Sequence, residues 1–86
     1  MTQDVSPVVD MLERILGGGE VSFEEVQRLR WQAEGELNLF VERIYRELRM
    51  FASDADIRGK DLEWDKSWRK GIRKLYDELR KRANIN

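Results

Sequence analysis

The sequence predicts an all-α protein, a small antiparallel bundle of three to four helices. Apolar residues recur at steps of three and four over most of the chain, which is the spacing of one helix face. Sustained alternation of apolar and polar residues and hairpin turn dipeptides, the usual signals of strands, do not occur in the 86 residues. This length fits a single domain, residues 1–86, near the lower limit for a self-sufficient core.

The first helix is expected over residues 7–16. Ser6 is its predicted N-cap, and Pro7 fits the first helical position, where its missing N–H leaves no hydrogen bond unmade. Three consecutive glycines at 17–19 then end the helix, since glycine readily adopts the positive φ angles of a C-cap and turn.

The second helix is expected over residues 23–52. Ser22 and Glu25 have the spacing of a capping box, in which each side chain accepts from the backbone N–H of the other residue. Helical spacing of apolar residues continues through the segment, which favours one long helix over two helices broken near Gly35. Glycine inside a helix costs about 1 kcal/mol relative to alanine.

The last helix is expected over residues 62–83. Its apolar face comprises Trp64, Trp68, Ile72, Leu75 and Leu79. Because the connections between the three segments are short, neighbouring helices are expected to run antiparallel.

Composition excludes several kinds of chemistry. The chain has no Cys and no His, so it forms no disulfide, thiolate zinc site, cysteine nucleophile or histidine-based triad. A helical domain of this size rarely forms the concave pocket that catalysis needs. We therefore expect a non-enzymatic protein without catalytic residues or cofactors. The sequence has neither an apolar run of about 20 residues nor a basic signal-peptide start, so we expect a cytoplasmic protein that does not bind membranes.

The segment of residues 53–65, SDADIRGKDLEWD, concentrates carboxylates between two predicted helices: Asp54, Asp56, Asp61, Glu63 and Asp65. Residues 54–65 have the length of a calcium-binding EF-hand loop, with Gly59 at the turn position. However, Arg58 puts a cation where an oxygen ligand belongs, and the final ligand position holds Asp rather than Glu. We therefore predict no metal site. The carboxylates either cap helices and pair with Arg58 and Lys60, or face a basic partner.

Two other features suggest binding surfaces. Phe40, Phe51 and Trp68 lie on apolar helix faces and are predicted to be core residues. Trp31 lies outside the apolar face of the second predicted helix. It either packs on the first helix or forms an exposed anchor for a partner.

The C-terminal segment, residues 66–86, has eight basic and two acidic residues, which would suit phosphate binding. These basic residues alternate with the apolar face, and the net charge of the chain is −1. Nucleic acid is therefore the less favoured partner.

Three segments taken together resemble the colicin D immunity-like family of small helical bacterial proteins. Residues 12–23, LERILGGGEVSF, combine an apolar helix end, a glycine turn and a capped helix. Residues 48–58, LRMFASDADIR, end an apolar helix in an Asp-containing segment with Ile-Arg, and a regularly amphipathic helix follows. The resemblance covers residues 8–80.

Members of that family protect a cell from its own ribonuclease toxin. The resemblance thus implies an immunity protein that neutralises a toxin domain with a basic active site. The expected partner-binding residues are Asp54, Asp56, Asp61 and Glu63, with Trp31 as a further candidate. Two alternatives remain: a homo-oligomeric helical adaptor, in which the chain forms a homodimer, and a small nucleic-acid-binding regulator that uses the basic last helix.

Overall fold

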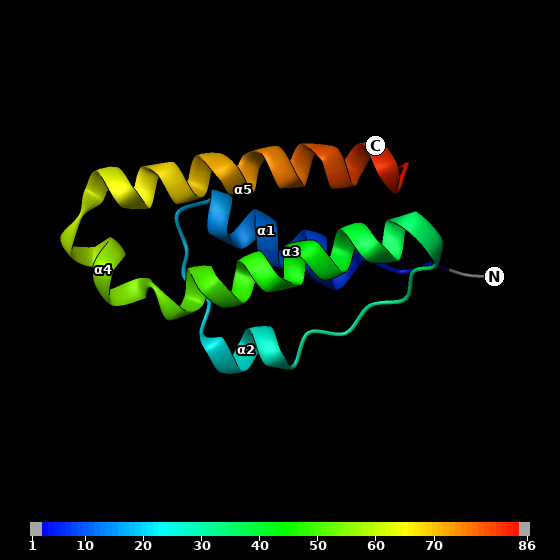
Figure 1. Ribbon diagram of the computed structural model, residues 1–86, viewed down its shortest axis with the longest axis horizontal. Helices are drawn as coiled ribbons and strands as arrows, with labels where there is room; N and C mark the ends of the chain where they lie inside the picture. The colour runs from blue at the N-terminus through cyan, green and yellow to red at the C-terminus, as the bar shows by residue number, and fades with distance from the viewer. Residues whose placement is uncertain (1–2, 85–86) are drawn as a thin grey trace.

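The computed structural model describes residues 3–84 and confirms the all-α class (Figure 1). Its helices are α1 (Ser6–Leu16), α2 (Phe23–Gln27), α3 (Gly35–Ser53), α4 (Ala55–Lys60) and α5 (Leu62–Arg82). The three long helices, α1, α3 and α5, form the bundle, and α3 and α5 run antiparallel (Figure 1). The short helix α4 is an addition to the prediction, whereas α2 and α3 are the two parts of the segment 23–52 in the four-helix alternative.

Helix α1 matches its predicted range to within one residue, but its N-terminal cap differs. The carboxylate of Asp4 accepts hydrogen bonds from the backbone N of Ser6 at 3.0 Å and from its hydroxyl at 2.6 Å. The Ser6 side chain is therefore not the cap, and Pro7 lies in the first turn as expected. At the other end Gly17 is the C-cap and Gly18 has a positive φ of 95°.

The prediction of one long helix over residues 23–52 is wrong. Helix α2 starts with the predicted capping box, in which Ser22 and Glu25 exchange two hydrogen bonds of 3.0 Å, but it ends at Gln27. Helix α3 begins only at Gly35, whose φ of 60° lies in the left-handed region that glycine tolerates.

An extended segment, residues 28–34, separates the two helices. Gln32 and Asp4 exchange backbone hydrogen bonds of 2.7 and 2.9 Å in an isolated antiparallel bridge. Leu29 is buried and Trp31 and Ala33 are partly buried, whereas the residues between them are exposed. The apolar residues of this segment therefore alternate as in a strand, although they also fit the helical spacing.

The acidic segment folds into helix α4 and the start of α5. Asp61 is the N-cap of α5, and its carboxylate accepts a hydrogen bond of 3.1 Å from the backbone N of Trp64. Helix α5 ends at Arg82, so it matches the predicted range of 62–83 to within one residue.

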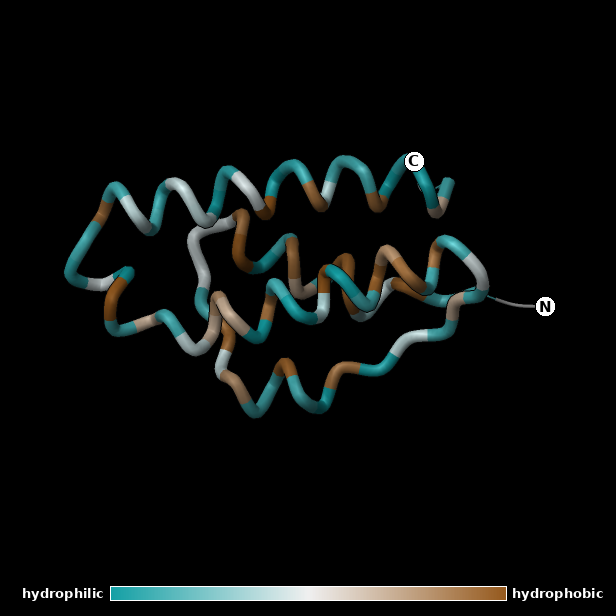
Figure 2. The backbone as a smooth tube through the Cα atoms, in the orientation of Figure 1, coloured by the Kyte–Doolittle hydropathy of each residue, from teal (hydrophilic) through white to brown (hydrophobic). Residues whose placement is uncertain are grey.

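The core lies where α1 packs between the other long helices. Val8, Leu12 and Ile15 of α1 are completely buried, together with residues of α3 and Leu79 of α5. Figure 2 shows the apolar residues of α5 on the side that faces α1 and its polar residues on the outer side. Phe40 and Phe51 belong to this core, as predicted, while Trp68 is only partly buried against it. Within residues 3–84, no helix combines the length and apolar character of a membrane span.

Candidate protein-binding surface

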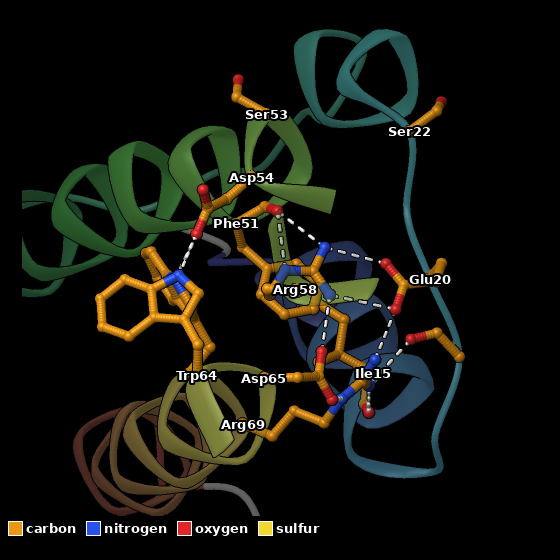
Figure 3. Close-up of polar contacts among 12 residues, drawn as sticks. Ile15, Glu20, Ser22, Phe51, Ser53, Asp54, Arg58, Trp64, Asp65 and Arg69 are labelled. Atoms are coloured by element: carbon orange, nitrogen blue, oxygen red, sulfur yellow. Dashed lines mark hydrogen bonds and ion pairs between the residues drawn. The ribbon is translucent and has the colours of Figure 1, made fainter. Parts of the chain in front are cut away.

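The most deeply buried charge of the protein is Arg58, which is 2% exposed. It lies in α4 and contacts Glu20, Phe51 and Asp65, which come from three other parts of the chain (Figure 3). With Arg69, which pairs with the same two carboxylates, these residues form what we call the Arg58 cluster. The cluster comprises Glu20, Phe51, Arg58, Asp65 and Arg69.

All five N–H donors of the Arg58 guanidinium form hydrogen bonds. Two go to the carbonyl of Phe51 at 2.8 and 3.2 Å, two to the Glu20 carboxylate at 2.9 and 3.1 Å, and one to Asp65 at 2.9 Å. The guanidinium carbon also lies 3.5 Å from the centre of the Phe51 ring. A planar cation stacked on an aromatic ring is an arrangement that arginine suits better than lysine.

Arg69 completes the cluster from α5. It donates to Asp65 at 2.8 Å, to the carbonyls of Ile15 at 2.6 Å and Gly19 at 2.9 Å, and to Glu20. Two arginines thus face two carboxylates, and their formal charges cancel. The cluster joins the end of α1 and the α1–α2 connection to α3, α4 and α5.

The charges in the cluster stabilise one another. The hydrogen bond from Arg58 lowers the pKa of Glu20, and the hydrogen bond from Arg69 lowers the pKa of Asp65. Burial lowers the pKa of Arg58, but its hydrogen bonds to Glu20 and Asp65 outweigh burial and raise it. Glu20 and Asp65 are therefore ionised at neutral pH, and all five donors of Arg58 are used within the fold. The cluster positions α4 and the start of α5.

Two of the predicted site residues make contacts within the fold. The Asp54 carboxylate accepts hydrogen bonds from the indole N–H of Trp64 and, at 3.0 Å, from that of Trp68. Asp61 caps α5, although its side chain is exposed.

The other two acidic site residues are solvated. Asp56 is exposed on α4, and the Glu63 side chain is 88% exposed, with Lys66 Nζ 3.8 Å away. An ion pair so exposed contributes little to stability. Asp56 and Glu63 are therefore available to a partner.

The geometry of residues 54–65 differs from that of an EF-hand loop, because Ala55–Lys60 is helical. Among residues 3–84, no three Asp or Glu side chains converge on a position that could hold a metal ion.

Exposed apolar side chains accompany the acidic ones. Ile57 is 57% exposed, Leu62 70% and Trp64 42%. Exposed apolar side chains that lie close together are more informative than single ones. They lie where α4 meets α5, at one end of the molecule (Figure 1). We call this surface the α4–α5 corner; it comprises Asp56, Ile57, Asp61, Leu62, Glu63 and Trp64.

Trp31 lies elsewhere. It packs on α3, where its indole N–H donates to Asn38 at 2.9 Å and its ring centre lies 5.5 Å from that of Tyr45. Asn38 is near the start of α3, whereas the α4–α5 corner follows the end of α3. The structure thus separates Trp31 from the acidic candidates.

Several basic residues of the last helix also have partners. Arg69 belongs to the Arg58 cluster, Arg80 donates to the Tyr76 hydroxyl at 3.0 Å, and Arg82 donates to Glu78 at 2.9 Å. These contacts reduce the number of cations available to a phosphate backbone.

Sequence reasoning missed the Arg58 cluster. It considered Arg58 as a cation in the place of a calcium ligand and as a local partner of the neighbouring carboxylates, and the ion pair with Asp65 agrees with the second alternative. It singled out neither Glu20 nor the contacts of Arg69. Glu20 is 38 residues from Arg58, and no local spacing relates two residues so far apart. The Ser-Phe-Glu-Glu capping signal after Glu20 indicated a helix start but not the partner of the preceding carboxylate.

No protein-family model, curated protein or solved structure matches the chain.

Proposed function

We propose that this protein is a non-enzymatic inhibitor that binds a basic protein surface through the α4–α5 corner. The observation that supports the proposal is that Asp56, Asp61 and Glu63 are exposed beside the exposed apolar side chains of this corner. Apolar anchors surrounded by charged groups are typical of protein-binding surfaces. The Arg58 cluster fixes the helix that presents them, which lowers the entropy cost of binding.

The resemblance to the colicin D immunity-like family suggests the kind of partner. A ribonuclease toxin needs a basic active site to bind the phosphates of its substrate. Carboxylates on a rigid helical corner can take the place of those phosphates, and opposite charge accelerates association as well as fixing orientation. We therefore propose a bacterial nuclease toxin as the partner, and neutralisation of that toxin in the cytoplasm as the function.

The test starts from the reading frames adjacent to the gene, because a toxin and its immunity protein are expected to be encoded together. Expression of the neighbouring product should stop growth, and co-expression of this chain should restore it. Toxicity that co-expression does not relieve would contradict the proposed function.

Purified proteins then test the surface. The variant Asp56→Asn/Glu63→Gln removes two negative charges and keeps the side-chain shapes. Its association rate with the toxin should be lower than that of the wild type and less sensitive to salt, because charge steering is weakened. Its melting temperature should stay within a few degrees, since exposed charges contribute about 0–1 kcal/mol each.

Asp10→Asn/Asp77→Asn is the matched control. It makes the same change in charge at exposed positions on α1 and α5, away from the corner. If both double variants slow association equally, only net charge matters, and the assignment of the α4–α5 corner is wrong.

A further inference from the structure

Helix α3 carries a second exposed surface, on the side that does not face α1 and α2. Leu39 is 65% exposed and Met50 is 57% exposed. They are separated by about three turns at 3.6 residues per turn, so they lie on the same face of the helix. Four charged residues lie between them on or beside this face. We call the set the α3 stripe; it comprises Leu39, Glu42, Arg43, Arg46, Glu47 and Met50.

The α3 stripe is complementary to itself in the antiparallel direction. Leu39 and Met50 lie equally far from the midpoint between Ile44 and Tyr45. If a second α3 lies antiparallel across this midpoint, Leu39 of each copy meets Met50 of the other.

The charges follow the same symmetry. Arg43 lies just before the midpoint and Glu47 just after it, so Arg43 of each copy meets Glu47 of the other. Glu42 and Arg46 form the same kind of pair on the other flank. One two-fold axis therefore produces apolar contacts at both ends and four ion pairs of opposite charge between them, as an isologous interface requires.

Contacts within the chain leave most of these charges without a partner. Among residues 3–84, Arg43, Arg46 and Glu47 form no ion pair and no side-chain hydrogen bond, while Glu42 accepts one from the Asn38 amide at 2.9 Å. Arg43 and Glu47 are four residues apart, but with the basic residue first this is the weaker order for a pair along a helix.

A groove between α3 and α5 borders the stripe. Its volume is about 320 Å³, and Arg43, Glu47, Trp68, Gly71 and Leu75 are among the residues that line it. A Cβ on Gly71 would meet no other heavy atom within 4 Å, so nothing in the fold requires glycine there. Glycine is among the least favourable residues inside a helix, but it allows another backbone to come close.

We propose that a second copy of this chain docks on the α3 stripe, with the two α3 helices antiparallel and each beside the α3–α5 groove of the other copy. The protein is then a symmetric homodimer. This proposal is independent of the toxin, and the α4–α5 corner, apart from Trp64 at the end of the groove, lies outside the stripe.

Sedimentation equilibrium of the purified chain, at concentrations up to about 1 mM, measures the association directly. The wild type should form dimers, and Arg43→Glu or Glu47→Arg alone should weaken dimerisation about tenfold or more, because each places like charges opposite one another at two symmetric positions. The double variant Arg43→Glu/Glu47→Arg should return to within about threefold of the wild type. A wild type that is monomeric at the highest concentration, or a double variant no better than the single ones, would overturn the proposal.

Gly71→Ala tests the close approach of the second helix. It should weaken dimerisation while leaving the melting temperature of dilute, monomeric protein unchanged or higher. Gly59→Ala is the control, since a Cβ at this α4 position also meets no atom within 4 Å and the residue lies outside the α3–α5 groove. Equal dimerisation of both variants and the wild type would show that no helix approaches Gly71. A monomeric chain in which Gly71→Ala instead weakens binding of the toxin would place a different partner in the groove and would also refute the homodimer.

Discussion

Replacing Arg58 with methionine should be among the most damaging single changes in this protein. The variant keeps much of the apolar stem but removes a buried guanidinium with five hydrogen bonds. Removing one partner of a buried ion pair typically costs about 3–5 kcal/mol, because the remaining charge has lost its counter-ion.

The structure places the cost at the lower end of that range. The Glu20 side chain is 53% exposed, so water can replace part of its interaction, and Asp65 keeps its hydrogen bond to Arg69. The carbonyl of Phe51 loses both of the hydrogen bonds that Arg58 donates and keeps a longer one of 3.3 Å from the backbone N of Asp54. Each lost hydrogen bond contributes about 0.5–1.5 kcal/mol. We therefore expect a loss of about 3 kcal/mol, a large part of the 5–15 kcal/mol typical of a domain.

Urea unfolding followed by tryptophan fluorescence measures this loss as a lower midpoint at an unchanged slope. In a thermal melt it corresponds to a decrease of about 12–24 °C for a domain of this size. Lys60→Met is the matched control, because it removes an exposed cation from the same helix and should change stability by less than about 0.5 kcal/mol.

Arg58→Lys separates charge from geometry. It keeps the positive charge but cannot reproduce the planar set of donors, so we expect a stability between those of the wild type and Arg58→Met. If Arg58→Met melts within about 4 °C of the wild type, less than 1 kcal/mol has been lost and the Arg58 cluster does not hold α4 in place.

Three further predictions concern the rest of the fold. Gly35→Ala should destabilise the protein by about 1–2 kcal/mol, because alanine is strained at the positive φ of this position, and Gly35→Asn should destabilise it less. Equal melting temperatures for the wild type and both variants would contradict the helix break. Trp68→Ala should lower the free energy of unfolding by about 2–3 kcal/mol, less than the 3–5 kcal/mol typical of a fully buried aromatic residue. Trp68→Phe should lower it by only about 1 kcal/mol, because this variant loses the indole hydrogen bond but keeps an aromatic ring. A melting temperature unchanged by Trp68→Ala would show that the ring does not pack on the core. The pKa values of Glu20 and Asp65 are lowered in the folded state, so their contribution to the free energy of unfolding is present above the ordinary pKa values of 4.5 and 3.8 and is lost as pH falls through the lower, folded values. The melting temperature should therefore decrease below about pH 4.5, and the variant Glu20→Gln/Asp65→Asn should show a smaller decrease; identical pH profiles would refute this origin.

Local signals were sufficient for most helix ends. The capping box at Ser22 and the glycines after Leu16 each act within a few residues, so their effect could be predicted without tertiary contacts. The expected core residues Phe40 and Phe51 followed from helical spacing in the same way.

The helical spacing of apolar residues gave a wrong prediction in the extended segment, residues 28–34. Leu29 and Ala33 fit the helical repeat, but with Trp31 they also fit the alternation of an extended chain. Tertiary contacts decided between the two, because the bridge to Asp4 and the packing of Trp31 on Tyr45 are available only to the extended form. Gly35 then allows the backbone to enter α3 at a positive φ.

The acidic segment shows the same limit at the candidate site. Its composition alone indicated a concentration of carboxylates that either cap helices or face a basic partner. Only the fold assigned them: Asp54 accepts from two tryptophans, Asp61 caps α5, and Asp56 and Glu63 remain solvated.

The sequence by itself thus determined the helical class, most helix boundaries and the lack of thiol or imidazole chemistry, because these depend on residue type and on interactions within one or two helical turns. The tertiary structure decided where the chain leaves the helix, which charges are buried and which carboxylates face solvent. Those outcomes depend on pairs such as Arg58 and Glu20, which are distant in the sequence and meet only once the helices have packed.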